Sequence, residues 1–244
     1  MPTAATRSAG VLALLLVACA GPGASSPESR PGVVPDARSE VRPEVRPDVS
    51  KIGDAAAWST MNAESRVAVE GGYKVLRLAP IGGNHKGSNI GMALVAGVAC
   101  AEGAIDVDLR GQGEGGASFV GVAFGVEDAS RYEAVYFRPF RFRSTDAAAR
   151  SHAVQYVAWP EHTWEALRAQ SPGVYESAIE PAPDPAGWFH ARIEIGHTTV
   201  KVFIDGAAQP TLVVNRLRNA RGGVALWVDS REGSFANLAI RPAA

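Results

Sequence analysis

Cysteine is scarce in this chain, and its scarcity excludes a fold held together by disulfide bonds. The 244 residues include only two cysteines, Cys19 and Cys100. Cys19 ends the N-terminal apolar run and Cys100 lies in the later part of the chain, so no disulfide framework is expected. Cys100 follows Val98 and Ala99, so we expect it to be a small buried hydrophobic residue and not a nucleophile.

An excess of one charge is also lacking. The chain has 24 basic and 25 acidic residues and a formal net charge of -1. Such a balance gives no electrostatic footprint for nucleic acid, so we expect no nucleic-acid partner. The five histidines are scattered without zinc-ligand spacing, and we expect no metal centre from them. No nucleophile elbow, HExxH motif or phosphate-binding glycine loop of the required spacing is present.

No apolar run is long enough to span a bilayer, but a shorter run lies at the N-terminus. A basic start followed by the apolar residues 10–18 predicts a signal peptide over residues 1–18. Its end, LVAC at residues 16–19, resembles the lipobox of bacterial lipoproteins. This resemblance implies cleavage before Cys19, acylation of that cysteine and, with Ala20 next, sorting to the outer membrane. The protein would then contact the membrane through its lipid anchor alone. The alternative is an ordinary cleaved signal with a chance cysteine.

The segment that follows has few large apolar residues. Residues 19–51 are rich in glycine, proline, serine and charge, and they repeat VRPE at 41–44 as VRPD at 45–48. Such a segment buries too little apolar surface to offset its ordering entropy, so we expect a disordered tether. One folded domain is expected over residues 52–244.

That domain is dominated by short runs rich in Val, Phe and Tyr, separated by turn formers. The region 119–159 holds three such runs, residues 188–195 alternate apolar and polar, and Asp205-Gly206 is a strong hairpin signal. The patterns predict about eleven to thirteen strands and one short inserted helix over residues 160–168. The sequence therefore indicates an all-β sandwich.

Three motifs in order carry a family resemblance. They are GVAFGVEDASRY at 121–132, VKVFIDG at 200–206, and GGVALWVD at 222–229 followed by GSFANLAI at 233–240. Across residues 55–242 the chain resembles the concanavalin A-like lectin/glucanase superfamily, which includes laminin-G-like domains, and it is also similar to 3-keto-disaccharide hydrolase-like domains. The resemblance implies a two-sheet antiparallel jelly roll with one concave face.

A concave sheet binds sugar with aromatic rings and planar polar groups. Successive residues of a strand point to opposite faces of the sheet, so alternation shows which candidate residues lie together on one face. Tyr136 and Arg138 share a face with Tyr132, and Glu133 lies on the other; the sequence does not decide which face is buried. Trp227 falls opposite the apolar face of its run, although it could instead pack beneath a loop or the helix. The predicted ligand-binding residues are Tyr136, Arg138, His152, Gln155, Tyr156, Trp159 and Trp227.

Three arginines come close together in sequence at positions 138, 141 and 143. They could grip a carboxylate or sulfate on an acidic glycan, or form a solvated charged rim.

Hydrolysis would require a carboxylate pair, and Glu133 and Asp229 are the catalytic candidates. The glucanase branch has an acidic trio spaced Glu-x-Asp-x-x-Glu. Here the nearest match is Asp106-Val-Asp108 with glycine at position 111, so the trio is absent. We expect no cofactor, and the Glu127-Asp128 turn is the one candidate donor for a structural calcium ion.

These observations support three hypotheses. The leading one is an envelope lipoprotein that binds carbohydrate non-catalytically. The alternatives are a glycoside hydrolase or lyase with its carboxylate pair on the concave sheet, and an envelope protein-interaction module.

Overall fold

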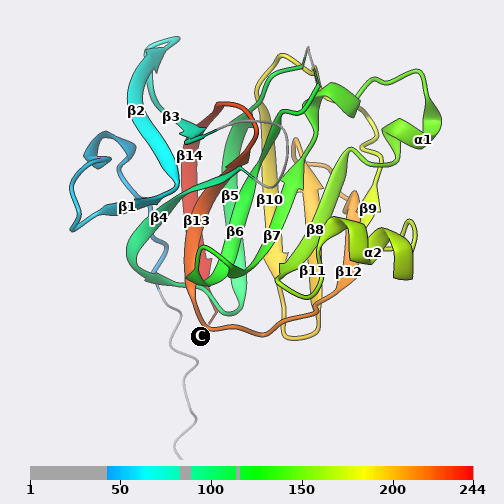
Figure 1. The fold of residues 1–244 in the computed structure, drawn as a ribbon. Helices are drawn as coiled ribbons and strands as arrows, with labels where there is room; N and C mark the ends of the chain where they lie inside the picture. The colour runs from blue at the N-terminus through cyan, green and yellow to red at the C-terminus, as the bar shows by residue number, and fades with distance from the viewer. Residues whose placement is uncertain (1–42, 83–88, 114–115, 244) are drawn as a thin grey trace, which may run out of the picture. The chain divides into compact units, whose positions relative to one another are not determined.

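In the residues that the structure describes, two antiparallel sheets of seven strands pack face to face around one hydrophobic core (Figure 1). The structure is a computed structural model and describes residues 43–82, 89–113 and 116–243. The first sheet, here called the groove sheet, has the order β1 (Trp58–Met61), β4 (Ile90–Ala99), β13 (Gly223–Asp229), β6 (Phe119–Asp128), β7 (Arg131–Phe137), β8 (Val154–Trp159) and β9 (Glu176–Ser177). The second, the back sheet, has the order β12 (Leu212–Asn215), β11 (Thr199–Ile204), β10 (Phe189–Ile195), β5 (Gly103–Arg110), β14 (Gly233–Pro242), β3 (Tyr73–Pro80) and β2 (Ala63–Glu70).

Alternation along the strands places the apolar residues between the sheets. In β10, Phe189, Ala191, Ile193 and Ile195 are buried, and the polar residues between them are half-buried on the outer side. The predicted all-β, two-sheet antiparallel jelly-roll sandwich is confirmed.

One central strand of the groove sheet has little strand signal in its sequence. β4 reads IGMALVAGVA, in which glycine and alanine take half of the positions. These residues have low strand propensity, and the run is nearly continuous in apolar character. Strand β4 forms because β1 and β13 pair with its two edges, so tertiary pairing overrides local preference.

The helical content is slightly larger than expected. α2 (Trp164–Gln170) begins four residues after the predicted start, because Ala158 and His162 form an antiparallel bridge and Thr163 caps the helix. The structure also contains α1 (Ala147–Arg150), which the sequence analysis missed, and two 3-10 turns, η1 (Val49–Lys51) and η2 (Pro139–Arg141).

The folded domain begins before residue 52. Val45 and Ile240 exchange backbone hydrogen bonds of 2.8 Å, and the Trp58 indole donates to the Asp48 carbonyl at 3.0 Å. Residues 43–51 therefore belong to the domain, and the predicted tether boundary falls too late in the chain. The predicted signal peptide, Cys19 and residues 19–42 lie outside the described residues. None of the helices in the described part of the chain has the length and apolar character needed to cross a bilayer.

Candidate functional site

A row of residues crosses the outward face of the groove sheet and forms the centre of the site. The strand registers place Trp227 beside Gly121, Gly121 beside Tyr136, and Tyr136 beside Gln155. A Cβ atom at Gly121 would lie 2.3 Å from the Val135 carbonyl oxygen, so this position requires glycine. Because Gly121 has no side chain, the rings of Trp227 and Tyr136 lean over it and stack with centroids 4.9 Å apart.

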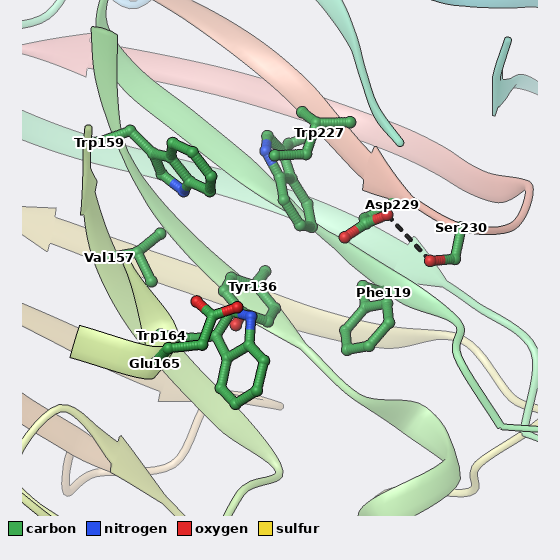
Figure 2. A pocket seen from close by; sticks show the side chains of 10 residues that line it. Phe119, Tyr136, Val157, Trp159, Trp164, Glu165, Trp227, Asp229 and Ser230 are labelled. Atoms are coloured by element: carbon green, nitrogen blue, oxygen red, sulfur yellow. Dashed lines mark hydrogen bonds between the residues drawn. The ribbon is translucent and has the colours of Figure 1, made fainter. Parts of the chain in front are cut away.

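A cavity of about 290 Å³ opens beside this stack (Figure 2). It is bounded by strands β4, β6, β7, β8 and β13 and by helix α2, and aromatic residues make up half of its lining. The lining residues are Ile90, Phe119, Tyr136, Val157, Trp159, Trp164, Glu165, Trp227, Asp229 and Ser230. We call it the aromatic cavity.

The three tryptophans of the aromatic cavity differ in how much surface they offer. Trp227 is only 2% exposed because Tyr136 covers one of its faces, so it forms a wall. Trp159 is half-buried and stacks on Tyr132 with ring centroids 6.2 Å apart. Trp164, from α2, is 40% exposed and has the Arg168 guanidinium 4.9 Å from its ring centroid. A ligand would therefore find its accessible indole surface on Trp159 and Trp164.

Two carboxylates line the aromatic cavity. Asp229, at the end of β13, accepts hydrogen bonds from the Asn89 amide at 3.2 Å and the Ser230 hydroxyl at 2.9 Å. Burial raises the pKa of Asp229, because desolvation disfavours the ionised carboxyl. Glu165 comes from α2 and is exposed; Figure 2 shows it beside Trp164, with Asp229 on the side of Phe119 and Ser230.

A second cavity, of about 190 Å³, adjoins the first and is rich in arginine. The two cavities have Phe119, Tyr136, Trp164 and Asp229 in common. The remaining lining residues of the second are Arg138, Phe140, Arg141, His152 and Arg168. We call it the basic cavity, and the two together the groove.

Arg138, Tyr136 and Gln155 form a hydrogen-bonded cluster at the floor of the groove. The Arg138 guanidinium donates to the Tyr136 hydroxyl at 2.9 Å and to Gln155 Oε1 at 2.5 Å, and the Tyr136 hydroxyl donates to Gln155 Oε1 at 3.0 Å. Burial raises the pKa of Tyr136 to about 12, and it lowers the pKa of Arg138. The cluster fixes the orientation of the stacked Tyr136 ring.

His152 lies at the end of the basic cavity. Its Nδ1 is 2.8 Å from Glu176 Oε2, and burial lowers its pKa, which favours the neutral ring at pH 7. Glu176 also accepts two hydrogen bonds from Arg168, at 3.0 and 2.6 Å. Glu176 thus holds Arg168 at the edge of the groove, next to His152.

Two of the predicted site residues lie on the opposite side of the sheet. Glu133 and Tyr156 point between the sheets, where the Tyr156 hydroxyl donates to Glu133 Oε1 at 2.7 Å. Arg216, which follows β12 in the back sheet, donates to Glu133 Oε2 at 2.8 Å. The structure therefore brings Tyr136, Arg138, His152, Gln155, Trp159 and Trp227 together at the groove and separates Glu133 and Tyr156 from it. A Glu133–Asp229 catalytic pair is incompatible with this placement.

The other acidic candidates are engaged elsewhere. Asp106 and Asp108 lie on β5 of the back sheet, where both contact the His190 ring. In the Glu127-Asp128 turn, Glu127 pairs with Arg218 at 2.7 Å and Asp128 pairs with Arg131 at 2.8 Å. Among the residues that the structure describes, no three His, Cys, Asp or Glu side chains gather in a metal-binding arrangement.

Several groove residues were missed by the sequence analysis, among them Phe119, Trp164 and Glu165. Phe119 has the same parity as Gly121 and so lies on the outward face, a signal that alternation along β6 carries. Trp164 and Glu165 carry no such signal, because their position depends on how α2 packs against β8.

Comparisons with known proteins are consistent with this architecture. No protein-family model matches the sequence, and no curated protein matches it. Among solved structures, the chain is similar to the carbohydrate binding module CBM66 from Bacillus subtilis, with 12% identity over 76% of this chain and 96% of that one, at a TM-score of 0.50. It is also similar to a GlcNAcα1-4Gal-releasing endo-β-galactosidase from Clostridium perfringens, with 11% identity over 84% of this chain and 62% of that one, at a TM-score of 0.52.

A third similar structure is a β-glucanase from Bacillus licheniformis, with 12% identity over 78% of this chain and 94% of that one, at a TM-score of 0.47. At these identities the likeness concerns the fold.

Proposed function

From the concanavalin A-like jelly-roll fold of this chain, we propose that it is a lipoprotein of the bacterial cell envelope that binds carbohydrate without cleaving it. The groove carries the proposal. Aromatic rings cover the apolar faces of sugars, and a planar polar side chain such as that of Asp229, which lines both cavities, hydrogen-bonds to hydroxyl groups. Apart from Ser230, the residues of the aromatic cavity come from β-strands and a capped helix, so this part of the site is largely preorganised.

Two further observations support binding without catalysis. One structural neighbour is a carbohydrate-binding module. In addition, the acidic trio of the glucanase branch is absent, and its nearest match, Asp106 with Asp108, lies on the back sheet and contacts His190.

The test uses two tryptophans in closely matched settings. Trp164 lines the groove and Trp188 does not; they are 40% and 36% exposed, and each has an arginine 4.9 Å from its ring centroid. The purified full chain is first screened on an array of cell-wall and plant glycans, and hits are titrated by calorimetry. We expect Trp164→Ala to weaken binding about tenfold and Trp188→Ala to leave it unchanged. An array without hits, or equal losses in the two variants, would contradict carbohydrate binding in the groove.

The envelope location rests on the sequence alone. Cys19 at the end of the LVAC motif would carry the acyl chains, and the segment after it would hold the domain away from the membrane. Expression in an enteric bacterium with labelled palmitate tests this part. We expect label on the wild-type chain, no label on Cys19→Ser, and recovery of the wild type in the outer-membrane fraction. An unlabelled wild-type chain would exclude the anchor.

A second candidate function is glycoside hydrolysis, which the two carboxylates of the aromatic cavity favour. A buried carboxyl with a raised pKa, such as Asp229, suits a general acid, and Glu165 lines the same cavity. Incubating the array hits with the full chain and measuring released reducing ends separates the two functions. Turnover that is lost in both Asp229→Asn and Glu165→Gln, with binding retained, would replace the binding proposal with this one.

A further inference from the structure

Arg138 is a buried cation without a counter-ion among the residues that the structure describes. It is only 6% exposed. Its guanidinium donates to the His152 carbonyl at 2.7 Å, to the Tyr136 hydroxyl and to Gln155 Oε1, all of them neutral acceptors. Burying a charge is costly unless an opposite charge offsets it. An anion in the basic cavity would supply that missing charge.

The backbone after β7 brings a second arginine to the same cavity. Arg138 caps the 3-10 turn η2, and the Arg141 amide donates to the Arg138 carbonyl at 2.8 Å. Side chains three residues apart eclipse each other in a 3-10 turn, so Arg138 and Arg141 point to the same side. Arg143 does not follow them, because its guanidinium reaches the Ala182 carbonyl at 3.3 Å. The structure thus separates the three neighbouring arginines into two that line the cavity and one that does not.

The charges around the basic cavity do not cancel. Three guanidinium groups line it, those of Arg138, Arg141 and Arg168. Two carboxylates oppose them: Asp229 lines the cavity, and Glu176 is paired with Arg168. Within the described part of the chain Arg141 has no ion pair, and its guanidinium lies 5.3 Å from the Phe140 ring centroid. The cavity therefore keeps an excess of positive charge, next to the aromatic surface of Trp164.

We propose that the groove selects acidic saccharides: the sugar ring lies against Trp164 in the aromatic cavity, and its carboxylate or sulfate group accepts hydrogen bonds from Arg138 and Arg141 in the basic cavity. The inference rests on the proposed carbohydrate binding and names the ligand class. Its geometric basis is that the two cavities adjoin through Phe119, Tyr136, Trp164 and Asp229. An arginine fork matches the planar carboxylate of a uronic acid and also the oxygens of a sulfate ester.

Arg141→Gln and Arg143→Gln provide the matched test. Both remove one positive charge from the same loop, but only Arg141 lines the groove. The full chain and both variants are titrated by calorimetry with short oligogalacturonates, with their methyl esters, with neutral galactan oligosaccharides and with sulfated galactan oligosaccharides. We expect the wild type to prefer an acidic probe over its neutral counterpart by about tenfold, Arg141→Gln to lose that preference, and Arg143→Gln to keep it.

Each result has a distinct meaning. Tighter binding of oligogalacturonates supports a carboxylate as the recognised group, and tighter binding of only the sulfated probes supports a sulfate. If neutral and acidic probes bind equally, and Trp164→Ala still weakens their binding, the inference is overturned and the proposal of carbohydrate binding stands. If Arg141→Gln and Arg143→Gln lose the preference for acidic probes equally, the preference is a general effect of net charge. That result would also overturn the inference. If no saccharide of the array or the titration binds, both proposals fail.

Discussion

Two clusters built from the same kinds of residue lie on opposite faces of β7 and β8. Outside, Tyr136 and Gln155 join Arg138 at the floor of the groove. Inside, Glu133 and Tyr156 join Arg216 between the sheets. Each cluster contains a tyrosine hydroxyl, a guanidinium and the side chain of Glu or Gln. The two clusters therefore differ mainly in one acceptor group and in their surroundings, which are the groove for one and the sheet interface for the other.

The inner cluster is complete by itself. Arg216 and Glu133 have side chains that are 1% and 0% exposed, and their charges cancel. The remaining donors of Arg216 reach the carbonyls of Ala101 at 2.6 Å and Gly196 at 3.3 Å, and the Leu217 amide donates to the Tyr156 hydroxyl at 3.0 Å. This network ties the two sheets together and has no open side for a ligand.

The outer cluster has an amide where the inner one has a carboxylate. Gln155 accepts from Arg138 as Glu133 accepts from Arg216, but it supplies no negative charge. The guanidinium of Arg138 is therefore hydrogen-bonded but not neutralised. The inner cluster is thus neutralised within the protein, whereas the outer cluster leaves a buried positive charge beside the groove.

The largest expected effect is the loss of the inner ion pair. Glu133→Gln keeps the shape of the side chain but leaves Arg216 as a buried, uncompensated charge. We expect the free energy of unfolding to fall by about 3–5 kcal/mol, measured by urea denaturation with tryptophan fluorescence. The double variant Glu133→Gln/Arg216→Met removes both charges and should recover part of this loss. A single-variant loss below about 1 kcal/mol would contradict the role given to the inner cluster.

Removal of the arginine from the outer cluster should have a mild effect on stability. Arg138→Met removes a charge whose burial is costly, and the hydrogen bond from Tyr136 to Gln155 remains. We expect the free energy of unfolding to change by about 1 kcal/mol or less, because relief of desolvation offsets the lost hydrogen bonds. Binding of acidic saccharides should be lost in the same variant. A loss of stability as large as that of Glu133→Gln would remove the distinction between the two clusters.

Asp229 allows a pH test of the groove. Burial raises its pKa above the value of the unfolded chain, so the native state binds the proton more tightly. The corresponding stability is fully present below the unfolded pKa, about 3.9, and is lost as pH rises through the higher folded pKa. Asparagine does not ionise, so Asp229→Asn lacks this pH-dependent contribution to stability. The variant should therefore gain stability relative to the wild type as pH rises above about 4, as measured by urea unfolding at several pH values; a constant difference would refute the assignment.

The smallest effect is expected at a third, more open cluster on the back sheet. His190 contacts Asp108 at 2.7 Å and Asp106 at 3.1 Å, and the hydrogen bond to Asp108 raises the pKa of His190. Its contribution is fully present below the unfolded pKa of about 6.5 and is lost as pH rises through the folded pKa. The side chain of His190 is 38% exposed, so His190→Gln should cost less than about 1 kcal/mol.

The cost of His190→Gln should be larger at acidic than at alkaline pH, and thermal unfolding at both pH values measures it. A cost that grows toward alkaline pH would contradict the sign.

Much of the fold and part of the site could be predicted from the sequence. Period-two patterns placed most of the strands, and they correctly put Tyr136 and Arg138 on one face and Glu133 on the other. Strand β4 was missed because its glycine and alanine residues carry little strand preference. Its two neighbouring strands, which are distant in sequence, supply the pairing that local propensity does not.

Local patterns were sufficient to predict an all-β sandwich, because alternation and turn chemistry are properties that each segment carries with it. Which face of β7 points outward depends on long-range contacts. Glu133 can be buried because Arg216, 83 residues later, meets it between the sheets, and no local pattern encodes that meeting. The same holds for the groove: its floor follows from strand alternation, whereas Trp164 becomes part of it only through the packing of α2. A binding site needs residues that converge in space, and convergence depends on long-range contacts.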